Sequence, residues 1–68
     1  MDTIYSRKIL AAEIKRLKEW NDEVNDIKMS DHKKYLEYQS YYDNGVEENI
    51  ELIKELETII DVLELTNL

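Results

Sequence analysis

The apolar residues of segment 46–65 recur at helical spacing and cover more of the helix circumference than one neighbour can bury. At about 100° per residue, the main stripe consists of Val46, Ile50, Ile53, Leu56, Ile60 and Leu63. Leu52, Ile59 and Val62 widen the apolar arc to roughly 240°, whereas a helix with one neighbour needs little more than about 100°. We therefore expect this helix to contact more than one other element.

The composition favours long helices and limits the ways in which so short a chain can be stabilised. Its 68 residues include one Gly, no Pro and no Cys, which favours helices over a sheet. A chain of this size buries only about 60% of the surface that its unfolded form exposes. Without Cys, disulfides and thiolate metal sites are excluded, so stability must come from regular helix packing, self-association, or both.

Three helices are predicted, over residues 3–28, 31–43 and 46–65. The core-facing stripe of the first helix consists of Ile9, Leu10, Ile14, Leu17, Trp20, Val24 and Ile27. Asn21 interrupts this stripe, and Asn49 interrupts the stripe of the third helix. The two amides either fix the register of the packed helices, as a buried Asn does in coiled coils, or lie at a solvated edge.

Two sets of local signals define the expected breaks between the helices. Ser30 is expected to cap the second helix, with Asp31 in its first turn. Asn44 or Gly45 is expected to end that helix, since both tolerate the left-handed conformation found after a helix C-terminus. Asn44 and Glu47 then resemble a capping box at the start of the third helix.

The helix lengths predict one all-α domain over residues 1–68, a three-helix arrangement with an antiparallel helical hairpin at its core. At about 1.5 Å per residue, the first and third helices span roughly 38 and 30 Å, and the second only about 20 Å. Part of the long hairpin is then left uncovered, and a symmetric homodimer is the simplest cover. A short three-helix monomer is the alternative. The residues expected to self-associate are Leu52, Ile59, Val62 and Leu63.

Charge is distributed unevenly along the chain, whose net charge is −7. Residues 1–34 hold eight Lys/Arg and seven Asp/Glu, whereas residues 35–68 hold one Lys and nine Asp/Glu. The acidic half disfavours direct binding to nucleic acid or anionic lipid and favours a basic protein partner. No apolar run approaches the ~20 residues that span a bilayer, and MDTIYSRKIL lacks the apolar region of a signal peptide. We expect a cytoplasmic protein.

Catalytic, cofactor and metal sites are not expected. One Gly cannot form a phosphate-binding loop, and His32 is the only histidine, without the partners that a metal site needs. Acid–base catalysis by the many carboxylates would require a pocket that shifts their pKa values. Such a pocket is rare in a helical domain of this size, so we expect no enzymatic activity.

The stretch YLEYQSYYDNGVEE, residues 35–48, contains four of the five tyrosines. Tyr35 and Tyr42 are expected to pack inside, while Tyr38 or Tyr41 is expected to be exposed, where tyrosines often form interfaces. An exposed aromatic bordered by carboxylates suits an arginine-rich surface. The predicted partner-binding residues are Tyr38, Tyr41, Glu37, Glu47, Glu48, Glu51 and Glu55.

Three functions fit this pattern. The favoured one is a small acidic interaction module, an adaptor or inhibitor, that docks on a basic protein surface through the tyrosine-rich, acidic corner. A narrower alternative is an inhibitor whose carboxylates mimic a nucleic-acid backbone and occupy a DNA- or RNA-binding protein. The third is a self-assembling scaffold, or a small-molecule sponge, with no protein target. Alternatively, the acidic face only keeps the protein soluble. The size and composition are typical of small proteins of bacteriophages and mobile elements.

Overall fold

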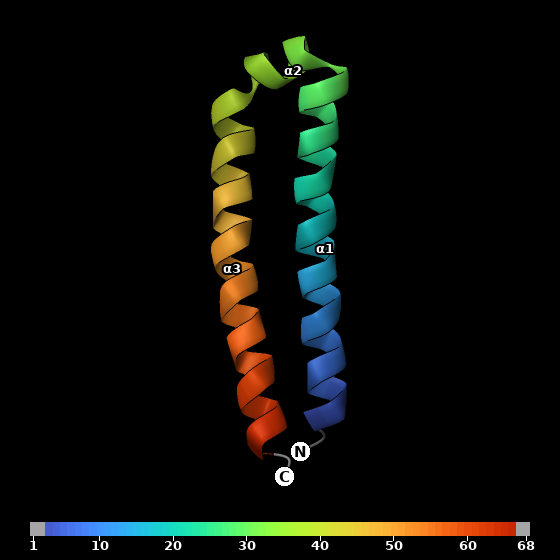
Figure 1. Ribbon diagram of the computed structural model, residues 1–68, viewed down its shortest axis with the longest axis vertical. Coiled ribbons are helices and arrows are strands. Elements are labelled where there is room, and N and C mark those ends of the chain that lie inside the picture. Colours follow the sequence, from blue (N-terminus) through green and yellow to red (C-terminus); the bar gives the residue numbers. More distant parts are fainter. Residues whose placement is uncertain (1–2, 67–68) are drawn as a thin grey trace.

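The chain forms a long antiparallel helical hairpin (Figure 1). A computed structural model describes residues 3–66. Helix α1 spans Thr3–Ser30, the short helix α2 spans His32–Glu37, and α3 spans Gln39–Thr66. The α2 helix lies across one end of the hairpin, and the start of α1 and the end of α3 lie together at the other end. The predicted all-α class, the three helices and the hairpin core are confirmed.

The break between α1 and α2 is made by Asp31, so the prediction that Ser30 caps the second helix is wrong. Asp31 is the N-cap, and its Oδ1 accepts a hydrogen bond from the backbone N–H of Lys34 at 3.2 Å. Ser30 is the last residue of α1, and its hydroxyl donates to the Asp26 carbonyl at 2.6 Å. Asp and Ser are equally good caps, and a Ser inside a helix can bond back to the preceding turn.

The second helix ends at Glu37, earlier than the predicted Asp43. Tyr38 leaves the helical conformation (φ −118°, ψ 24°), and its N–H is shared between the carbonyls of Lys34 and Tyr35. The α3 helix begins at the next residue, Gln39. The last five residues of the predicted second helix, 39–43, therefore form the start of α3.

Asn44 and Gly45 lie inside α3, so the predictions that they end one helix and cap the next are wrong. Gly45 has no positive φ, and nothing in its backbone requires a glycine. A Cβ added at Gly45 would instead lie 2.5 Å from Cη2 and 2.8 Å from Cζ3 of Trp20. The glycine is therefore needed for the close approach of the Trp20 ring to α3, not for a turn.

The core is small and gathers toward the end of the hairpin that α2 closes. The buried hydrophobic residues among those described are Ile14, Leu17, Val24, Tyr35 and Tyr42. The last three form one cluster, against which Trp20, Ile27 and Val46 pack half-buried. Ile9 and Ile50 belong to the predicted stripes but are exposed. Both lie at the margin of their stripe, beyond the reach of a single opposing helix.

The hairpin is much more extended than a compact protein of its size. Its principal extents are 50 × 15 × 14 Å and its radius of gyration is 15.4 Å, whereas a compact chain of 68 residues has about 11 Å. The accessible surface is 5371 Å², against about 4,500 Å² for a compact monomer of this mass. Because α2 covers only one end, the wide apolar arc of α3 is buried in part.

The two asparagines of the apolar stripes meet across the hairpin. The Asn49 Nδ2 donates to the Asn21 Oδ1 at 3.0 Å, and the pair is partly buried. This direct bond agrees with the first of the two interpretations, in which the amides set the register of α1 against α3.

Replacement of Gly45 by Ala should destabilise the hairpin, although Ala is the better helix former by about 1 kcal/mol. The added methyl would overlap the Trp20 ring, so we expect the free energy of unfolding to fall by about 1–2 kcal/mol. Urea denaturation followed by circular dichroism measures this change. Asn44→Ala, an exposed position on the same turn, is the matched control and should not destabilise. Equal stabilisation by both variants would contradict the proposed role of Gly45.

Candidate functional site

The aromatic side chains Trp20, Tyr35, Tyr38, Tyr41 and Tyr42 gather where α2 closes the hairpin, and we call this cluster the aromatic end. Tyr35 and Tyr42 are buried, as predicted, and their rings stack with centroids 6.2 Å apart. The Tyr35 hydroxyl donates to the Asp43 Oδ1 at 2.5 Å. This bond and burial raise the pKa of Tyr35, because the carboxylate favours the neutral hydroxyl.

Tyr38 and Tyr41 form the outer layer of the aromatic end, with exposed fractions of 53% and 65%. Both rings pack on the buried Tyr42, with centroids at 6.2 and 5.5 Å, and Tyr41 also meets the edge of Trp20 at 6.1 Å. The prediction that Tyr38 or Tyr41 is exposed is confirmed for both. Each ring thus packs on the buried Tyr42 on one side and is exposed to solvent on the other.

A shallow groove lies beside Tyr41, between α1 and α3. Its walls include the rings of Trp20 and Tyr41, with Gly45 between them, and the Glu48 side chain also lines it. Two aromatic rings at 79° to each other beside a carboxylate form a setting in which a guanidinium can stack and pair at once. Sequence reasoning missed Trp20 as a site residue, because its place in the apolar stripe indicated only core packing.

The predicted acidic residues fall into two groups. Glu37 ends α2 and lines a surface hollow with Tyr38 and Tyr41. The others form the acidic face of α3, which consists of Glu47, Glu48, Glu51 and Glu55. Glu55 lies 14 residues from Tyr41, or about 21 Å along the helix axis. The structure therefore brings Glu37 and Glu48 to the aromatic end, while Glu51 and Glu55 extend the negative surface away from it.

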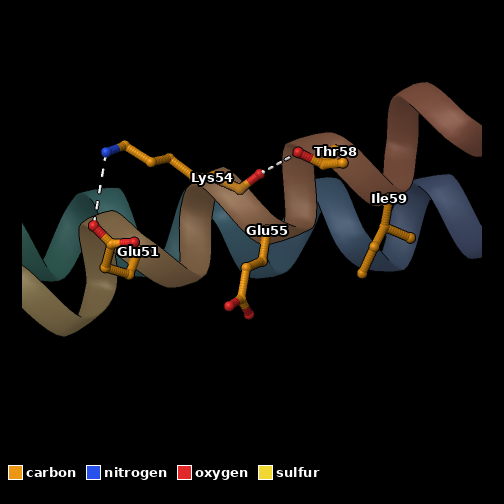
Figure 2. Close-up of a pocket in the computed structure, with 5 residues that line it drawn as sticks. All are labelled: Glu51, Lys54, Glu55, Thr58 and Ile59. Atoms are coloured by element: carbon orange, nitrogen blue, oxygen red, sulfur yellow. Dashed lines mark hydrogen bonds and ion pairs between the residues drawn. The ribbon is translucent and has the colours of Figure 1, made fainter.

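Most of the acidic face has no basic partner within the hairpin. Of its four carboxylates, only Glu51 has an ion pair within residues 3–66, with Lys54 at 3.7 Å. Figure 2 shows Lys54 turned toward Glu51, while Glu55 and Ile59 point away from it on another side of α3. The hollow drawn there is lined by residues of α3 alone. It is thus an exposed stretch of helix surface and not a cleft.

Ion pairs connect the two helices on one side of the hairpin. The Arg7 Nη1 lies 3.7 Å from the Glu64 Oε1, and the Lys18 Nζ lies 3.8 Å from the Glu57 Oε1. Elsewhere on α1, Arg16 forms two bonds with Glu13, and this hydrogen bonding lowers the pKa of the Glu13 carboxyl.

The residues predicted to self-associate lie on two sides of α3. Leu52 and Ile59 are 38% and 46% exposed, and Leu63 is half-buried. At about 100° per residue, these three side chains fall within about 40° of one another. Val62 is exposed as well, but it lies about 80° from Leu52, toward the back of α3.

The described residues show no sign of a metal site or a membrane span. Within residues 3–66, no three His, Cys, Asp or Glu side chains are placed to hold a metal ion. His32 stacks on Tyr35 with ring centroids 6.1 Å apart. None of the helices in this part of the chain combines the length and apolarity needed to cross a membrane.

Comparison with known proteins adds no further assignment. No protein-family model matches the chain, and no curated protein or solved structure is significantly similar to it. The physical properties of the hairpin surface must therefore carry the functional argument.

The Tyr35–Asp43 bond should make stability depend on pH at the alkaline end. Because the folded-state pKa of Tyr35 is raised, the stabilisation is complete below the ordinary tyrosine pKa of about 10 and is lost as pH rises through the folded-state value. The stability difference between wild type and Tyr35→Phe should therefore shrink above about pH 10. Urea denaturation at pH 8 to 11 tests this, with Asp61→Asn as a control for an exposed acid of α3. A difference that stays constant would contradict it.

Proposed function

We propose that the protein is a protein–protein interaction module, an adaptor or inhibitor, that docks on a basic protein surface through the aromatic end and the acidic face of α3. The observation that carries the proposal is the pair Tyr38 and Tyr41, exposed yet held by the buried Tyr42. Aromatic rings held in place in the free protein lose little side-chain entropy on binding. Such residues form the anchors of many interfaces.

Charge supports a basic partner. The α3 helix carries eight Asp/Glu and one Lys, and most of the acidic face is free of ion pairs within the described chain. A concentrated negative field accelerates encounter with a basic surface. An arginine-rich partner gains further, because its guanidinium groups can stack on Tyr38 while they pair with Glu37, which lines the same surface hollow.

We further propose that the protein acts as a homodimer. A lone hairpin leaves Leu52 and Ile59 exposed along α3. Its accessible surface of 5371 Å² exceeds the about 4,500 Å² of a compact monomer of this mass. A second copy would cover the apolar surface that α2, at one end of the hairpin, does not reach.

Light scattering should report twice the 8.2 kDa mass of one chain at micromolar concentration. The double variant Leu52→Glu/Ile59→Glu should be monomeric, because two carboxylates cannot be buried at an apolar interface without a large cost. Val62→Glu, at an exposed site toward the back of α3, is the control and should remain dimeric. Helicity by circular dichroism should persist in all three proteins. A monomeric wild type at high concentration would overturn the dimer.

Docking is tested by affinity capture from the native host, followed by rate measurements on the captured protein. The triple reversal Glu47→Lys/Glu51→Lys/Glu55→Lys should slow association by about tenfold or more at low salt. Tyr38→Ala/Tyr41→Ala should weaken binding by about tenfold or more, through faster dissociation. Helicity should be retained, since all five side chains are exposed.

A matched control reverses three exposed acids of α1, Glu19, Asp22 and Asp26, to Lys. This variant has the same net charge as the α3 reversal, so equal slowing by both would show that only net charge matters. Binding that is insensitive to both the α3 reversal and the tyrosine changes would refute the proposed docking surface.

A nucleic-acid mimic is the second candidate. The α3 helix is unbroken from Gln39 onward. Its residues Glu47, Glu51 and Glu55 therefore follow one another on a single helix face, about 6 Å apart. This spacing is compatible with the repeat of backbone phosphates. Competition between duplex DNA and the protein for the captured partner would favour mimicry, and its absence would favour docking on another basic surface.

A further inference from the structure

The two long sides of the hairpin differ in whether ion pairs join α1 to α3. On one side, Arg7–Glu64 and Lys18–Glu57 join α1 to α3. On the opposite side, Arg16, Trp20 and Leu52 line the groove between the helices, and the described residues form no ion pair between α1 and α3. Ion pairs between α1 and α3 therefore cover the first side, and none covers the second side within the described residues.

The second side carries a set of exposed and half-buried apolar side chains, which we call the apolar flank. It consists of Ile9, Trp20, Leu52, Leu56, Ile59 and Leu63. At about 100° per residue, Ile9 and Trp20 lie within about 20° of each other on α1. Leu52, Ile59 and Leu63 lie together on α3, so the flank receives side chains from both helices.

We infer that a second copy of the chain lies on the apolar flank, with α1 of each copy against α3 of the other. The inference rests on the proposed self-association and specifies its arrangement. The charges of the helices decide between the possible neighbours. The α1 helix holds six Lys/Arg and five Asp/Glu, whereas α3 holds one Lys and eight Asp/Glu. Contact between two α3 helices would place like charges along the whole interface.

Arg16 agrees with this arrangement. Its side chain is 65% exposed at the edge of the apolar flank, where it pairs with Glu13. Placed against an α3 helix, its guanidinium meets a second acidic surface near the partner's Glu55. Placed against another α1 helix, it would meet the partner's Arg16 instead.

Geometry then sets the relative direction of the two hairpins. A two-fold axis that runs across the hairpins would place α1 on α1 and α3 on α3, so α1–α3 contacts between the copies need an axis along the bundle. In one copy, α1 runs antiparallel to its own α3 (Figure 1). A partner's α3 that is also antiparallel to α1 requires two hairpins pointing the same way. The two-fold axis then runs along the bundle, and both aromatic ends lie at one end of the dimer.

The side of the hairpin that carries the apolar flank is large enough for this interface. A side of the hairpin measures 50 by 15 Å, or about 750 Å² of projected area per copy, close to the ~800 Å² that each partner contributes to a standard stable interface. With both aromatic ends together, a partner protein that carries two basic sites could be held at both at once, which raises its effective affinity.

Cysteine cross-linking tests the arrangement, and the chain has no native cysteine to interfere. Ile9→Cys and Ile59→Cys lie at about the same height on the flank sides of α1 and α3. The two variants are mixed in urea, refolded together and oxidised with oxidised glutathione. A disulfide needs Cα atoms within about 7 Å. We therefore expect cross-linked dimers in the mixture and none in either variant alone. In an equal mixture they can reach about half of all dimers, because random pairing puts one copy of each variant in about half of them.

A control pair, Lys8→Cys with Ile59→Cys, places one cysteine on the back of α1 and should not cross-link. Light scattering on each sample separates the two proposals. Dimers by mass without cross-linking in the first mixture would overturn the arrangement and leave self-association intact. Monomers by mass would overturn both.

Discussion

The contact between Trp20 and Gly45 sets the geometry on which the aromatic end depends. Because residue 45 has no side chain, the indole ring lies directly against α3 and brings the helices close at this level. The same ring meets the edge of Tyr41 and packs near Tyr42. Buried rings thus support exposed ones, so a packing requirement of the core also orders the surface that we propose for docking.

The fold class and the burial of the tyrosines could be predicted from the sequence because both follow from helical periodicity. The periods of apolar residues predicted α1 and most of α3, and the same spacing placed Tyr35 and Tyr42 inside. The breaks could not be predicted in the same way. Asn44 and Gly45 carry a strong helix-stop signal, but Gly fits a close helix contact as well as a left-handed turn. Only the position of Trp20 in space distinguishes these two uses.

The candidate site was predictable in its residue types and less so in its shape. The surplus of apolar residues in 46–65 indicated that one neighbour would not suffice, and exposed Leu52 and Ile59 are the result. The sequence did not reveal that the hairpin has one side closed by ion pairs between its helices. Pairs such as Lys18 with Glu57 join residues far apart in the chain, where local spacing gives no guidance.

The placement of the core at the closed end has a consequence for the order in which the chain folds. Tyr35, Tyr42 and Val24 are joined by short stretches of chain, so their contacts form with a small loss of loop entropy. Helices that zip together from such a nucleus fold quickly. The open end, with few buried contacts, would fray first and exchange its amide hydrogens fastest in the isolated hairpin.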